Sequence, residues 1–79
     1  MDYDTLLEKA KLKAYELPLG TEFTLRNLFQ GTFWNELEVG VRLEFGRRFK
    51  YAVTSGAIPC VIYIGKNASN ASLYQKQSI

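Results

Sequence analysis

The side chains of this sequence that could do chemistry are mainly basic, and they are densest between residues 41 and 54. This basic group and its neighbouring hydroxyl groups consist of Arg47, Arg48, Lys50, Tyr51 and Thr54. Arginine can donate paired hydrogen bonds to a guanine edge, and lysine suits a phosphate. The residue types therefore indicate contact with a polyanion, although a charged face is also the ordinary solvated side of a helix.

The residue types that most enzymes and metal sites depend on are scarce. The chain has no histidine, so it offers no imidazole base or imidazole ligand. Its single cysteine, Cys60, cannot form an intrachain disulfide or a structural zinc site, and we expect it to act as a small hydrophobe. No glycine-rich phosphate loop is present. We therefore expect no enzyme activity, no metal and no cofactor.

Length and composition predict one domain over residues 1–79. A hydrophobic content of 47% is enough for one compact core. No apolar run reaches the roughly 18 residues that a membrane helix needs, and the N-terminus does not resemble a secretory signal. We expect a cytoplasmic protein without membrane contact.

The net charge of +2 is unevenly distributed along the chain. Residues 1–40 contain four Lys or Arg and seven Asp or Glu, which gives −3. Residues 41–79 contain six Lys or Arg and one Asp or Glu, which gives +5. Such a split orients the basic half of a small protein toward a polyanion.

A long helix of about Val39–Ser55 must position the basic group. At 100° per residue its apolar stripe consists of Phe45, Gly46, Phe49, Ala52 and Val53. A glycine inside a helix costs roughly 1 kcal/mol against alanine, so Gly46 suggests close approach of an earlier helix. Arg42 projects to the inner side, which favours a structural role, at the rim or paired with Glu22, Glu36 or Glu38, over contact with DNA.

The N-terminal half predicts a helix of about Asp4–Leu17, ended by Pro18. A strand stub follows at Glu22–Thr24, and Thr24 can cap a short helix of Leu25–Gln30. Residues 32–40 are then expected to form a connector with a helical turn around residues 35–37. Its Trp34 is expected to be a core anchor rather than a platform for a base.

The C-terminal part predicts a β-hairpin. Cys60–Ile64 is rich in β-branched and aromatic residues, Gly65–Ala71 is a turn-forming segment, and Ser72–Gln77 alternates as a return strand. Lys66, Asn67, Ser69 and Asn70 would lie at the tip of this hairpin, and Lys76 on its return strand.

This order of elements resembles a winged helix–turn–helix. The residues that carry the resemblance are FTLRNLF from Phe23, then Trp34, then GVRL and GRRF in the long helix, then IPCVIYIGK and SLY. The sequence is also similar to short, mostly uncharacterised proteins of Gram-positive bacteria and their phages, which share an R-L-x-x-G-R-x-F helix. The fold class implied is α+β, with three helices, a strand stub and a hairpin wing.

The resemblance implies binding of double-stranded DNA, as in a small transcriptional regulator or a phage-related accessory factor, with the long helix in the major groove and the wing on the backbone or in the minor groove. Glu44 departs from this picture, because it would repel phosphate. The DNA-contacting residues implied are Arg26, Arg42, Arg47, Arg48, Lys50, Tyr51, Thr54, Lys66, Asn67, Ser69, Asn70 and Lys76.

Two further possibilities remain open from the sequence. The alternative to DNA binding is a protein-interaction module, in which Leu43, Tyr51 and either Tyr63 or Tyr74 form an apolar docking patch. A homodimer is also possible, with the first helix or the edge of the final strand as its surface.

Overall fold

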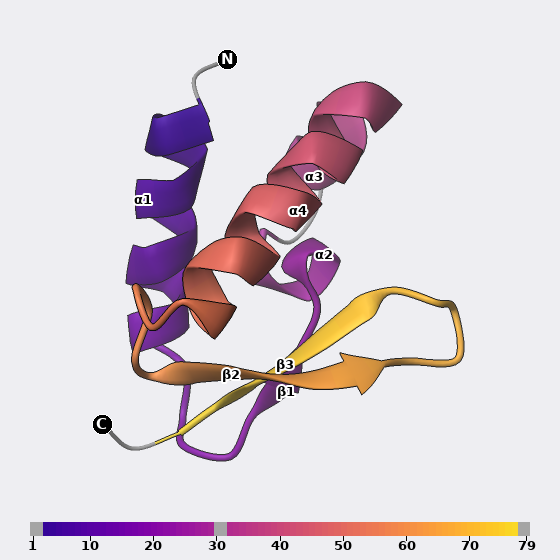
Figure 1. Cartoon of the computed structure of the whole chain (residues 1–79). Coiled ribbons are helices and arrows are strands. Elements are labelled where there is room, and N and C mark those ends of the chain that lie inside the picture. Colours follow the sequence, from indigo (N-terminus) through magenta and orange to yellow (C-terminus); the bar gives the residue numbers. More distant parts are fainter. Residues whose placement is uncertain (1–2, 30–31, 78–79) are drawn as a thin grey trace.

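The computed structural model describes residues 3–29 and 32–77 of the chain (Figure 1). Over these residues it is a small α+β fold with four helices and a three-stranded antiparallel sheet. The elements are α1 (Tyr3–Tyr15), β1 (Glu22–Phe23), α2 (Leu25–Leu28), α3 (Thr32–Glu36), α4 (Val39–Thr54), β2 (Val61–Lys66) and β3 (Ser72–Lys76). None of the described helices has the length and apolar content that crossing a membrane requires.

The helices differ from the predicted ones mainly between α2 and α4. Thr24 caps α2 as predicted: its Oγ1 accepts a hydrogen bond from the Asn27 amide at 3.3 Å. Residues 32–36 form a helix, α3, in the segment where a connector with only one helical turn was predicted. Aromatic packing explains this helix, because the Phe29 ring stacks on Trp34 at 5.7 Å and contacts Phe33 at 5.4 Å. The predicted end of the second helix at Gln30 lies outside the described residues.

The sheet has the strand order β1–β3–β2, so the last strand of the sequence lies in the middle. Phe23 of β1 pairs with Tyr74, and Tyr74 pairs on its other side with Tyr63 of β2. The register shifts between Tyr63 and Gly65, where Gly65 has a φ of 127° that favours glycine. The prediction that the final strand offers a free edge for dimerisation is wrong along its paired residues.

The core is formed between α1, α4 and the sheet, which lie close together in Figure 1. Phe45, Phe49, Ala52 and Val53 are buried on one stripe of α4, as predicted. Tyr74 occupies the middle of this core, and the Phe49 ring meets it edge-on at 4.9 Å and 87°. Burial of this aromatic contact holds α4 against β3. Cys60 is a free cysteine that is buried in the same hydrophobic core, as predicted.

Lys76 is buried, with an exposed fraction of 8%. Its Nζ donates hydrogen bonds to the carbonyl oxygens of Ala14 at 2.8 Å, Tyr15 at 2.9 Å and Leu17 at 3.2 Å. Carbonyl groups at a helix C-terminus lack partners within the helix and attract a positive charge. Lys76 therefore caps the C-terminal end of α1. The prediction that Lys76 is available to contact DNA is wrong, because its side chain is buried.

Replacing Lys76 with methionine should lower the free energy of unfolding by about 2 kcal/mol, because three buried or half-buried carbonyl groups lose a charged donor. Urea denaturation followed by circular dichroism measures this change. The same replacement at Lys13, an exposed position near the end of the same helix, is the matched control and should cost less than about 0.5 kcal/mol. Equal effects at both positions would contradict this role of Lys76.

Candidate nucleic-acid interface

A groove of about 700 Å³ lies between α4 and the β2–β3 hairpin, and residues of α2 and α3 also line it. We call it the α4–hairpin groove. Its basic lining residues are Arg26, Arg42, Arg47, Lys50 and Lys66. No aspartate or glutamate is among the described residues that line it. The groove therefore concentrates positive charge from α2, α4 and β2, although the chain as a whole carries only +2.

One face of α4 borders the groove along most of the helix. The lining residues of α4 are Val39, Arg42, Leu43, Gly46, Arg47 and Lys50. Their spacings of three and one repeat along a single helical stripe. This stripe lies beside the buried one, so α4 has separate faces for the core and for the groove.

Gly46 belongs to the groove stripe and not to the contact between helices. A methyl group added at Gly46 would meet no atom of the described residues within 4 Å, apart from its chain neighbours and the backbone of its own helix. The prediction that another helix approaches closely at Gly46 is therefore wrong. Helical periodicity assigned Gly46 to the buried stripe of α4, but Gly46 lies at the border between the buried stripe and the groove stripe and is only half-buried.

Arg42 also lines the groove. The ion pair predicted with Glu22, Glu36 or Glu38 is absent from the ion pairs of the described residues. Its Nε is buried and has no hydrogen-bond partner among the residues that the structure describes. A buried donor without a partner is costly, so this position has a free capacity for an acceptor.

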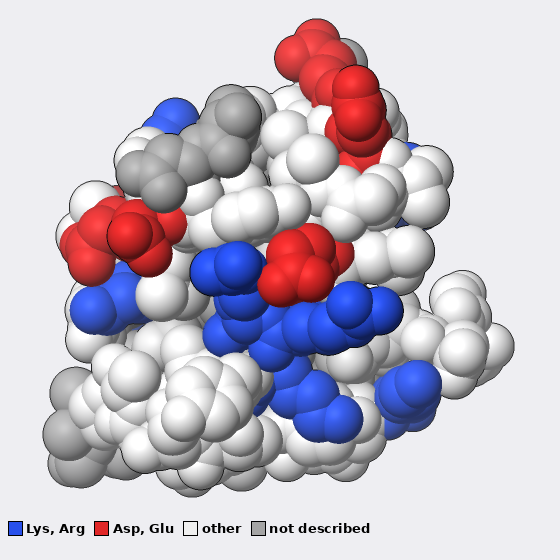
Figure 2. All heavy atoms as spheres, turned by 45° about the horizontal axis from the view of Figure 1, so that its top comes forward, with Lys and Arg blue, Asp and Glu red and all other residues white. Residues whose placement is uncertain are grey.

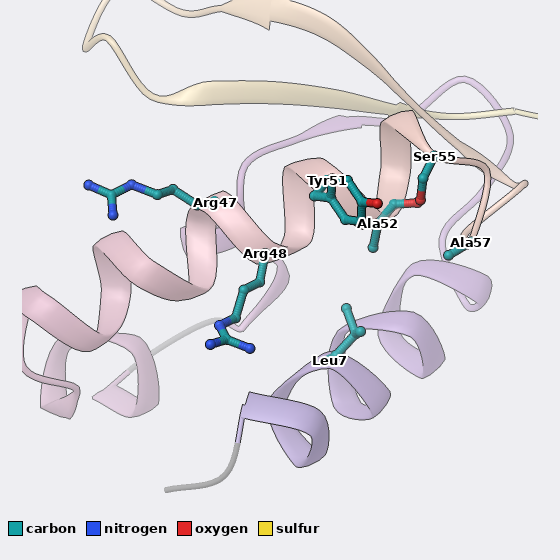
Figure 3. Close-up of a pocket in the computed structure, with 7 residues that line it drawn as sticks. All are labelled: Leu7, Arg47, Arg48, Tyr51, Ala52, Ser55 and Ala57. Atoms are coloured by element: carbon teal, nitrogen blue, oxygen red, sulfur yellow. The ribbon is translucent and has the colours of Figure 1, made fainter.

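Arg47 and Arg48 point in different directions, as Figure 3 shows. Arg47 extends away from α1 and lines the groove. Arg48 points toward α1, where its guanidinium carbon lies 4.5 Å from the centre of the Tyr3 ring. Glu44 contacts both, at 3.4 Å from Arg47 Nη1 and 3.0 Å from Arg48 Nε. The sequence predicted both arginines on one surface, and the structure brings only Arg47 to the groove.

The hairpin brings two of the four predicted tip residues to the groove, Lys66 and Asn70. Asn67 instead shapes the turn, because its Oδ1 accepts hydrogen bonds from the amides of Ser69 at 2.9 Å and Ala71 at 3.0 Å. Ser69 is exposed at the tip and is not among the residues that line the groove. Only part of the tip therefore faces α4.

Lys50 connects the helix side of the groove to the hairpin. Its Nζ lies 4.4 Å from the centre of the Tyr63 ring, a cation–π contact. This contact orients Lys50 toward β2, whose last residue is Lys66. The two lysines thus lie on the two walls of the same groove.

Tyr51 and Thr54 lie outside the groove. Tyr51 is 73% exposed and borders a second hollow of about 430 Å³ between α1 and α4, whose lining also includes Leu7, Arg48 and Arg47, a residue shared with the groove (Figure 3). Thr54 Oγ1 donates a hydrogen bond to the Tyr51 carbonyl oxygen at 3.3 Å. The apolar docking patch that the sequence suggested around Tyr51 cannot include Tyr74, which is fully buried.

Figure 2 shows that lysine and arginine side chains gather over the middle of one face, while most acidic side chains in that view lie toward its margins. The sequence identified the cations of the groove, but of the apolar residues that line it only Leu43 was predicted to be exposed, as part of a docking patch. Those apolar residues include Leu25, Trp34, Val39 and Leu43. Trp34 is both the packing residue that was predicted, stacked on Phe29, and part of the groove wall.

Tyr74 is among the residues that line the groove, although it is fully buried. Burial raises the pKa of Tyr74 to about 12, an effect that the neighbouring Ser72 partly offsets. Its hydroxyl oxygen is buried and makes no hydrogen bond of acceptable geometry. The folded state therefore favours the neutral phenol.

The raised pKa of Tyr74 predicts a loss of stability at high pH. Below pH 10 the phenol is neutral in both states, so its contribution is fully present. Between about pH 10 and 12 the unfolded chain loses the proton first, and stability falls by up to roughly 2 kcal/mol. Urea denaturation at several pH values measures this fall, which should be smaller in Tyr74→Phe. An identical pH dependence in both proteins would contradict the assignment.

Comparison with known proteins places the chain in a family. A search of curated proteins gives no match. The chain resembles the solved structure of a protein described as "SCCmec type IV LP1413 - nucleic acids binding protein", with a TM-score of 0.76 and 24% identity, over 98% of this chain and 88% of that one. At this identity the likeness shows a shared fold. Residues 8–76 match the family described as "Domain of unknown function (DUF1413)", and the chain belongs to that family.

Proposed function

We propose that this protein binds nucleic acid, and specifically duplex DNA, through the α4–hairpin groove. The observation that carries the proposal is the convergence of five basic side chains from three elements on one groove whose described lining holds no carboxylate. A polyanion is the ligand that such a field favours. The similarly folded protein is itself described as nucleic-acid binding, which supports the same conclusion.

The proposal includes a winged helix–turn–helix arrangement for the DNA contact. In it α4 is the recognition helix in the major groove, and the β2–β3 hairpin is the wing on the backbone. Arg47 can fork onto a guanine edge, while Lys50 and Lys66 suit phosphates. This contact requires no catalytic group, and we propose a role as a small transcriptional regulator or phage-related accessory factor.

Glu44 sets a limit on the strength of this contact. It lies within ion-pair distance of Arg47 and Arg48, so part of their charge is neutralised before any ligand arrives. Exposed pairs of this kind add little to stability, about 0–1 kcal/mol. Their main effect in this proposal is on affinity, because Arg47 must share its guanidinium between Glu44 and a phosphate or base.

A protein-interaction role is the second candidate. The observation in its favour is that Val39 and Leu43, at the apolar end of the groove, are 60% and 62% exposed. Exposed apolar residues that cluster can mark a docking site. This candidate predicts binding that does not depend on salt, whereas phosphate contacts do.

Arg47 and Arg48 point in different directions, and this difference provides a test of the DNA proposal. Arg47→Gln and Lys66→Gln should each weaken binding to a random duplex and reduce the slope of log K against log salt by about one. Fluorescence anisotropy at low and moderate salt measures both quantities. Arg48→Gln removes the same charge from a neighbouring residue outside the groove, and its effect should be clearly smaller.

Two results would count against this assignment. If the unmodified protein does not bind duplex DNA at low salt, the nucleic-acid function is wrong. If Arg48→Gln weakens binding as much as Arg47→Gln, the protein responds to total charge, and the groove is not the contact surface. Circular dichroism spectra of all variants show whether the fold is retained.

A further inference from the structure

Gly46 has no evident structural role in the described fold. It lies in the interior of α4, a helix of 16 residues. Glycine is less favourable than alanine in such a position, because its more flexible backbone loses more conformational entropy when the helix forms. It is not among the glycines with positive φ. A Cβ atom at Gly46 would contact no other helix or strand among residues 3–29 and 32–77 within 4 Å. Neither backbone geometry nor packing therefore requires a glycine here.

The surroundings of Gly46 are those of a binding site. It lines the α4–hairpin groove between Arg42 on one side and Arg47 and Lys50 on the other, with Lys66 on the hairpin. Any side chain at this position would project into the groove. The missing Cβ exposes the bare surface of the helix at the point where the cations converge.

A second observation points to an acceptor in the same groove. The Nε of Arg42 is buried and has no hydrogen-bond partner. A buried unpaired donor is unfavourable in the free protein, and a turn of the Arg42 side chain toward an anionic oxygen in the groove would give it a partner. Arg42 and Gly46 are four residues apart, so they are neighbours on one face of the helix.

We propose that Gly46 is the point where the sugar–phosphate backbone of a bound nucleic-acid strand passes closest to α4, with Arg42 and Lys66 among the groups that neutralise it. This inference rests on the proposed function and specifies what occupies the groove. At Gly46 itself the neighbouring group is the backbone and not a base edge, because Gly46 offers no side-chain donor or acceptor to read a base. A glycine is instead suited to close approach of another chain.

The experiment uses two glycines of the same helix. Gly46→Ala and Gly46→Gln are compared with Gly40→Ala and Gly40→Gln, because Gly40 also has no atom within 4 Å of an added Cβ and does not line the groove. Circular dichroism melting and anisotropy with random duplex DNA are measured for all four. Gly46→Ala should raise Tm by about 2–6 °C and weaken DNA binding several-fold. Gly46→Gln should weaken it by at least about tenfold.

The Gly40 variants should bind DNA like the unmodified protein, and the loss in Gly46→Gln should be equal for duplexes of different sequence. A loss that depends on sequence would overturn the backbone assignment in favour of base recognition. A lowered Tm for Gly46→Ala would show that the fold needs the glycine and would also overturn the inference. Unchanged binding by Gly46→Gln would do so too, while leaving the proposed function standing. Absence of DNA binding by the unmodified protein would instead refute the proposed function.

Discussion

The contact between Phe49 and Tyr74 is the interaction on which the rest of this structure depends. The two rings meet edge-on at 4.9 Å in the fully buried centre of the core. Tyr74 also contacts Phe23 of β1 and Tyr63 of β2, so one side chain links α4 to all three strands. Because this contact fixes the distance between the helix and the hairpin, it also fixes the width of the groove between them.

Much of the fold could be predicted from hydrophobic periodicity and turn chemistry. The ends of α1 and α4 lie within about two residues of the predicted ones, and the buried residues of α4 follow a 3.6-residue period. The helix α3 could not be predicted, because it depends on Phe33 and Trp34 packing against Phe29. That contact is tertiary, and local propensity carries little information about it.

The candidate site was harder to predict than the fold. The cations of the groove were identifiable by residue type, but their directions depend on partners elsewhere in the chain. Arg48 turns toward the Tyr3 ring, and Lys76 turns inward to the end of α1. A period-2 pattern correctly placed Lys76 on the same side as Tyr74, yet the chemistry of lysine suggested exposure. The attraction of the carbonyl groups at the end of α1 for a positive charge outweighs that expectation.

The central position of β3 has a consequence for how the molecule is made. Synthesis runs from the N-terminus, and β3 is the last described strand, yet β1 and β2 pair only through it. A growing chain that lacks β3 has helices and strands but no sheet, and Lys76 has not yet reached α1. Folding must therefore wait until the final described residues have left the ribosome, and until then the apolar face of α4 needs protection from aggregation.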